Sequence, residues 1–145
     1  MLDATYNKYK SRMNDVIEHY QEELSLNTDG WTNPQDDSII NYVLIIQDEA
    51  IFVKLVSTGK DHHTGIYIAD GLKETIGELG SQNLCAITTD NASNMKSSWN
   101  EIQIKYPLIN CIGCRAHMTN LLVNDIMAIP AINEAFSAIK EVNKY

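Results

Sequence analysis

The chain has 145 residues, which is enough for one ordinary domain with a single hydrophobic core. Its hydrophobic content of 44% and charged content of 21% exclude a disordered chain. The 11 basic and 19 acidic residues give a net charge of -8, which disfavours a freestanding nucleic-acid binder, because phosphate contacts supply most non-specific affinity. No apolar run reaches the roughly 20 residues of a membrane span. Three cysteines make no disulfide framework, so a reducing compartment is favoured.

The first part of the chain predicts one helix followed by three strands. Apolar side chains recur at helical spacing over residues 2–20, and residues 23–31 alternate as in a strand. Residues 38–47 form a nearly continuous β-branched run, typical of a strand covered on both faces, and residues 51–59 predict the next strand. Because the connections are too short for a crossover helix, we expect an antiparallel meander.

Helices and strands alternate in the second part. The pattern predicts a helix over 64–80 that stops at Gly80, a strand over 83–90, a helix from 91 that ends before Pro107, a strand over 108–114, and a helix from 116 that is interrupted around Pro130 and then resumes to the last residue. We therefore expect a single domain over residues 1–145, with a mixed five-stranded sheet and helices on both faces. This strand order is the ribonuclease H-like layout, in which the first and fourth strands are neighbours.

Two aspartates end these two strands. Asp29 lies in "NTDGWTN" and Asp90 in "ITTDNASNM", each after an apolar run and a threonine. If the strands are neighbours, the carboxylates meet and require a proton or a cation. Hard oxygen ligands suit Mg²⁺ or Mn²⁺, and two such ions support phosphodiester chemistry. The alternative is structural, because Asp-Gly is a common turn and Asp90-Asn91 can precede a helix cap such as Ser93 or Asn94.

The stretch "CIGCRAH" raises the question of zinc. Cys111, Cys114 and His117 follow one another at intervals of three, but a structural zinc site needs four ligands. His62, His63 and Cys85 are possible remote fourth ligands. We favour the alternative, in which the cysteines are small buried groups at a strand end and zinc is not bound.

The three motifs "NTDGWTN", "ITTDNASNM" and "CRAHMTNLLVND" together resemble the core of hAT-type DNA transposases. They are especially similar to a transposase-derived domain of unknown function. The resemblance implies that Asp29 and Asp90 match the first two members of an Asp-Asp-Glu triad, which holds divalent ions for DNA strand cleavage and transfer. Cys114 and His117 match a cysteine and a histidine of that family, with a structural or site-supporting role. The other matching positions, for which only support of the site is implied, are Trp31, Asn91, Asn94 and Asn120.

The third acid of the triad has no match in this sequence. In the family that glutamate lies downstream of a helical insertion, and we have no reason to assign the role to Glu134 or Glu141. We expect a catalytic-core fragment, truncated before the insertion, that is inactive alone and meets DNA only through a longer parent protein. The alternative hypothesis is a domesticated, non-catalytic domain that binds protein partners or a second copy. The resemblance also implies residence in the nucleus.

Overall fold

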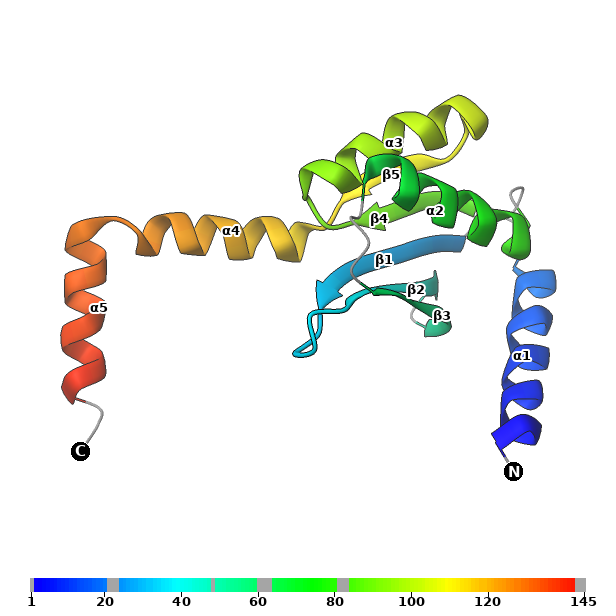
Figure 1. Ribbon diagram of the computed structural model, residues 1–145, viewed down its shortest axis with the longest axis horizontal. Helices are drawn as coiled ribbons and strands as arrows, with labels where there is room; N and C mark the ends of the chain where they lie inside the picture. The colour runs from blue at the N-terminus through cyan, green and yellow to red at the C-terminus, as the bar shows by residue number, and fades with distance from the viewer. Residues whose placement is uncertain (1, 21–23, 48, 60–63, 81–83, 143–145) are drawn as a thin grey trace. The chain divides into compact units, whose positions relative to one another are not determined.

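The computed structural model describes residues 2–20, 24–47, 49–59, 64–80 and 84–142. The chain divides into two compact units, Met1–Gly113 and Cys114–Tyr145, and each is described by itself. The first unit holds the sheet and three helices, and the second holds two helices (Figure 1).

The first unit follows the predicted order of elements. Its helices and strands are α1 (Leu2–His19), β1 (Leu24–Thr32), β2 (Ser38–Ile46), β3 (Glu49–Gly59), α2 (Gly65–Leu79), β4 (Leu84–Thr89), α3 (Ser93–Lys105) and β5 (Asn110–Gly113). Every predicted element is present, with ends shifted by a few residues. Gly80 follows α2 with a φ of 84°, a conformation that favours glycine, and confirms the predicted stop.

The sheet has the order β3-β2-β1-β4-β5. β1 pairs antiparallel with β2, and β2 pairs antiparallel with β3. β4 pairs parallel with β1 on one side and with β5 on the other. The predicted meander and the central position of the first and fourth strands are both confirmed, and this mixed order is the ribonuclease H-like fold.

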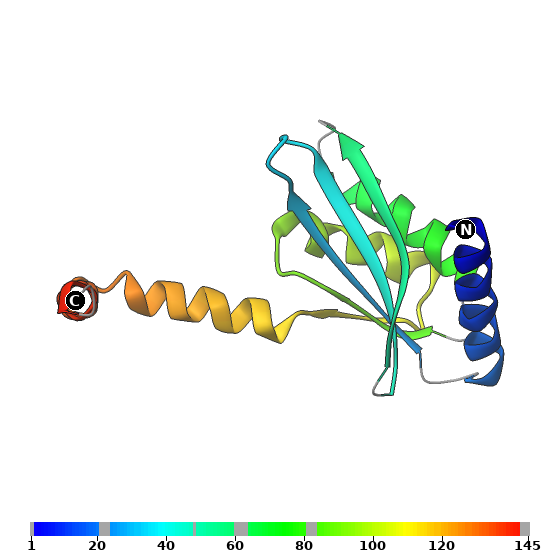
Figure 2. The same ribbon diagram turned by 90° about the horizontal axis from the view of Figure 1, so that it is seen from below.

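The core lies between one face of the sheet and the helices α2 and α3. Strand residues such as Leu24, Leu26, Leu44 and Ile87 are buried to 0% exposure. α2 and α3 lie side by side on the sheet in both views (Figures 1 and 2). Burying this face stabilises the unit by roughly 1.5–3 kcal/mol for each large aliphatic side chain.

The opposite face of the sheet is only partly buried. Along β2 fully buried residues alternate with half-buried ones, so the prediction that this strand is covered on both faces is wrong for the described structure. The residues between the buried ones, Val43 and Ile45, are half-buried, and Phe52, the partner of Val43 on β3, is exposed. Continuous β-branched sequence indicates strand propensity but does not by itself indicate which faces are covered.

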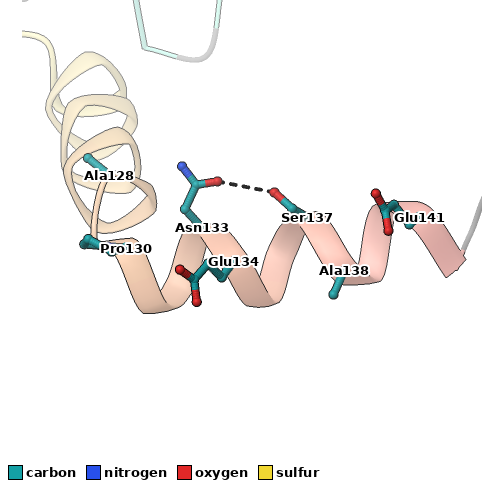
Figure 3. Close-up of a pocket in the computed structure, with 7 residues that line it drawn as sticks. All are labelled: Ala128, Pro130, Asn133, Glu134, Ser137, Ala138 and Glu141. Atoms are coloured by element: carbon teal, nitrogen blue, oxygen red, sulfur yellow. Dashed lines mark hydrogen bonds between the residues drawn. The ribbon is translucent and has the colours of Figure 1, made fainter.

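The second unit consists of α4 (Arg115–Met127) and α5 (Pro130–Val142), with the predicted interruption just before Pro130. α4 has no buried residue, and α5 carries the exposed apolar side chains Ile132, Phe136 and Ile139. The end of α4 and one side of α5 line a shallow hollow that includes Glu134 and Glu141 (Figure 3). Among the described residues, no helix is both long and apolar enough to cross a membrane.

Candidate metal centre

Both aspartates follow the parallel pairing of β1 with β4. The parallel ladder runs through Leu26↔Ile87 to its last pair, Asn27↔Thr88. Asp29 lies two residues beyond this pair within β1, and Asp90 lies two residues beyond it, just after the end of β4. Both residues therefore follow the paired part of two neighbouring strands, whose chains run in the same direction.

A buried threonine precedes each aspartate. Thr28 is 2% exposed and Thr89 is 0% exposed, because both side chains belong to the face under α2 and α3. Successive strand residues point to opposite faces, so the alternation directs Asp29 and Asp90 away from the core. Asp29 is exposed and Asp90 is half-buried. In each pair, the threonine therefore anchors the chain on the buried face of the sheet. The aspartate that follows presents its carboxylate on the open face.

Asp29 is held by the neighbouring strand β2. The Thr28 hydroxyl donates to the main-chain oxygen of Asn41 at 2.8 Å. The Asp29 N–H donates to the side-chain Oδ1 of the same asparagine at 2.9 Å. Asp29 Oδ1 in turn accepts the N–H of Gly30 at 3.0 Å. The alternative of an Asp-Gly turn is wrong, because both residues lie within β1 and pair with Asn41 and Ile40 of β2. Asn41 thus fixes both residues of the pair.

Asp90 is held by its own turn and by α3. Its Oδ1 accepts the N–H of Ala92 at 2.7 Å, and Ala92 occupies the N-cap position of α3 without a side-chain cap. The predicted capping by Asn94 is wrong, because α3 begins one residue earlier and the Asn94 Oδ1 accepts from the next residue, Met95, at 3.0 Å. The carboxylate of Asp90 accepts from the amide at the N-cap instead.

A hydrogen-bonded chain also reaches Asp90 from inside α3. The indole Nε1–H of Trp99 donates to the Thr89 hydroxyl at 3.2 Å. The same hydroxyl donates to the main-chain oxygen of Asp90 at 2.7 Å. Thr89 lies in the motif "ITTDNASNM", but Trp99 is an uncharged residue outside the quoted motifs, so no sequence pattern predicts this contact.

Asn91 packs against the backbone of β5. A side chain at Gly113 would overlap the carboxamide oxygen of Asn91, so the strand must carry glycine at this point for the two to approach. Glycine is the residue expected where another group must come close to the backbone. The predicted supporting role of Asn91 stays a prediction, but its contact with β5 fixes the turn that follows Asp90.

The remaining predicted residues fall at separate places. Trp31 lies at the end of β1 and is 42% exposed, on the same side of the strand as Asp29 by alternation. Cys114 precedes α4 in the second unit, His117 is half-buried in the first turn of α4, and Asn120 is exposed one turn later. Their roles at the site remain predictions.

The expectation that zinc is not bound stays a prediction. Burial raises the pKa of the Cys111 thiol above its usual range. Within the described residues, no three or more His, Cys, Asp or Glu side chains gather as a possible metal site. His62 and His63 lie outside the described residues.

The donor set at Asp29 and Asp90 fits a hard divalent cation. Each carboxylate uses Oδ1 for a main-chain N–H close by in sequence, that of Gly30 or that of Ala92, which fixes its orientation. The second oxygen of each accepts no hydrogen bond from the residues that the structure describes. Mg²⁺ and Mn²⁺ prefer carboxylate oxygens and keep several waters, so two carboxylates at an open strand edge suit them better than an enclosed site.

The sheet order β3-β2-β1-β4-β5 with its helices defines a ribonuclease H-like fold. Residues 1–142 match the family described as Domain of unknown function (DUF659), and the chain belongs to that family. A sequence comparison with curated proteins gives no match.

Two solved structures illustrate the structural likeness. The HTLV-2 integrase catalytic core domain, solved in complex with magnesium in a trimeric form, is 18% identical over 79% of this chain and 82% of that chain, with a TM-score of 0.42. A chain of the simian T-cell lymphotropic virus intasome, solved in complex with the PP2A regulatory subunit B56 gamma, is 16% identical over 79% of this chain and 45% of that chain, also with a TM-score of 0.42.

Proposed function

We propose that this domain is the catalytic core of a hAT-like transposase, or of a protein derived from one, and that Asp29 and Asp90 hold Mg²⁺ or Mn²⁺ for DNA strand cleavage and transfer. The observation that carries the proposal is the neighbouring, parallel placement of β1 and β4, each with a buried threonine before an outward-facing aspartate. A divalent ion there would activate the attacking oxygen and stabilise the leaving one in a phosphodiester reaction.

The protein's own residues hold the two negatively charged carboxylates in position. Thr28 and Thr89 anchor the two strand ends, and the main-chain amides of Gly30 and Ala92 orient the carboxylates. Sites of this type use a third carboxylate, and no third acidic group joins the pair within the described residues. We therefore propose that these 145 residues bind a divalent ion weakly and do not cleave DNA unless a further acid is supplied. We also propose that the protein acts in the nucleus and meets DNA through a longer parent protein.

Manganese titration followed by NMR tests the metal site. Paramagnetic broadening should begin at residues around Asp29 and Asp90 in the wild-type chain. The double variant Asp29→Asn with Asp90→Asn should lose it. The matched control, Asp36→Asn with Asp125→Asn, removes the same charge elsewhere and should keep it. Broadening that follows surface acidity alone, unchanged in the first double variant, would refute the proposal.

A second candidate function is a domesticated, non-catalytic domain that binds another protein or a second copy. Two features support it: the net charge of -8 opposes DNA, and α4 exposes apolar side chains, with Met118 at 55% and Leu122 at 58% exposure. Self-association is tested by comparing the sedimentation of the wild type with that of the double variant Met118→Ser and Leu122→Ser. A monomer at all concentrations would count against the second-copy form of this proposal.

A further inference from the structure

The turn at Asp90 is connected to the interior of the protein by a side chain that no motif marks. Trp99 is half-buried on α3, ten residues from Thr89, and its indole N–H ends on the Thr89 hydroxyl at 3.2 Å. That hydroxyl has 0% exposure, so no solvent molecule competes for it. A hydroxyl that accepts one hydrogen bond has its own proton directed toward a different partner.

The proton of the Thr89 hydroxyl goes to the main-chain oxygen of Asp90, at 2.7 Å. Hydrogen bonds in such a chain polarise one another, so the indole strengthens the bond between Thr89 and Asp90. The main-chain oxygen is therefore fixed on one side of Asp90, and the Ala92 N–H at 2.7 Å fixes the carboxylate on the other. Both hydrogen bonds restrain the backbone angles of Asp90, and these angles set the direction of its side chain.

We propose that Trp99, acting through Thr89, is a positioning residue for the Asp90 carboxylate and sets how tightly this strand end holds a divalent cation. The inference rests on the proposed metal site, and it assigns to Trp99 a role beyond packing. Asp29 has no equivalent, because its threonine bonds to the neighbouring strand instead.

The experiment uses Trp99→Phe, which keeps an aromatic ring in α3 and removes the N–H donor together with part of the indole ring system. The wild-type and variant 145-residue chains are compared by Mn²⁺ titration and by exchange of the Ala92 amide proton without metal. Manganese affinity should fall about fivefold, as expected for the loss of one buried neutral hydrogen bond. Exchange at Ala92 should become faster by a similar factor, because the turn that directs Asp90 Oδ1 onto this amide is loosened.

Two further variants separate positioning from general stability. Ser98→Ala removes a buried hydroxyl on the same helix, which donates to the main-chain oxygen of Met95 at 2.7 Å and does not contact Asp90. It should destabilise the fold without changing either readout. Thr89→Ser keeps the hydroxyl and should behave as wild type in both.

The outcomes are distinguishable. Unchanged Mn²⁺ affinity and unchanged Ala92 exchange in Trp99→Phe would overturn the inference, and so would equal changes in Ser98→Ala. A change in exchange with no change in affinity would overturn the link to the cation. If the wild type shows no localised Mn²⁺ response, the proposed function fails, and the Ala92 exchange alone then decides whether Trp99 positions Asp90.

Discussion

The Thr28–Asp29 pair is held by a neighbouring strand, whereas the Thr89–Asp90 pair is held by a helix. On β1, one residue of β2, Asn41, bonds to the threonine hydroxyl and to the aspartate amide. On β4, the threonine hydroxyl is fixed by Trp99 of α3. The same two-residue sequence therefore has two different supports.

The two kinds of support predict different responses of Asp29 and Asp90 to mutation. β1 is paired with β4 only over Leu24–Asn27, but its antiparallel ladder with β2 continues past Asp29 to Thr32↔Ser38. The ladder of β4 ends before Asp90, with Thr89↔Gly113 as its last pair. Asp29 thus sits within a ladder, while Asp90 lies in a turn that depends on side-chain contacts.

The largest effect is expected when either of the two carboxylates is removed. Asp29→Asn and Asp90→Asn, made singly, should each lower Mn²⁺ affinity at least about tenfold, because each removes half of the negative charge at the site. Isothermal titration calorimetry on each variant measures this. If one variant binds as wild type, the two aspartates do not share a cation.

The second prediction concerns the buried hydroxyls. Thr89→Val leaves both the Trp99 indole N–H and the Asp90 main-chain oxygen without their partner, so the free energy of unfolding should fall by about 2–3 kcal/mol. Thr28→Val leaves only the Asn41 main-chain oxygen without its hydroxyl donor and should cost about 1 kcal/mol. Urea denaturation measures the free energy of unfolding of both variants. Equal losses in the two variants would contradict the conclusion that the two threonines are supported differently.

The third prediction tests the contact between Asn91 and β5. Gly113→Ala places a methyl group against the Asn91 carboxamide and should destabilise the fold by about 1–3 kcal/mol, as overpacking does. Asn91→Ala in the same chain should relieve most of that loss, because it removes the group that the methyl meets. A double-mutant cycle by thermal unfolding gives the coupling energy, and additive effects would show that the close approach is not what constrains Gly113.

The smallest effect is expected at Asn41. Asn41→Ala removes the acceptor of the Asp29 N–H, but Asp29 is exposed and water can replace the bond. The loss of stability should be about 0.5–1 kcal/mol, and the main change should be at the amide of Asp29. Amide exchange resolved by residue measures it, with Asn27→Ala, an exposed neighbour on the same strand, as the control.

Much of this fold follows from local sequence. The alternation in residues 24–26, the helical spacing over 65–79 and the glycine at position 80 predict their elements, because strand and helix periodicity are properties of a few consecutive residues. The short links after Thr32 and Ile46 require an antiparallel meander for the same reason. The position of Asp90 directly after a strand was predictable in the same way, whereas β1 continues past Asp29 to Thr32.

Other features depend on contacts between distant residues. That β1 lies beside β4 came from resemblance to a known sheet order, since no periodicity specifies which strands are neighbours. Trp99 and Gly113 carried no signal, because their partners, Thr89 and Asn91, are chosen by how α3 and β5 pack on the sheet. Asn94 was expected to cap a helix, but the exact start of α3 is decided by the Asp90 carboxylate at the amide of Ala92.

The sequence by itself determined that a buried threonine precedes an aspartate on each of two strands, because hydrophobic alternation fixes which side chain is buried. Only the tertiary structure decided that the pairs are neighbours and that one is supported by Asn41 and the other by Trp99. The physical reason is that a hydrogen bond depends on the positions of both partners, and those positions are set by packing of the whole sheet and its helices.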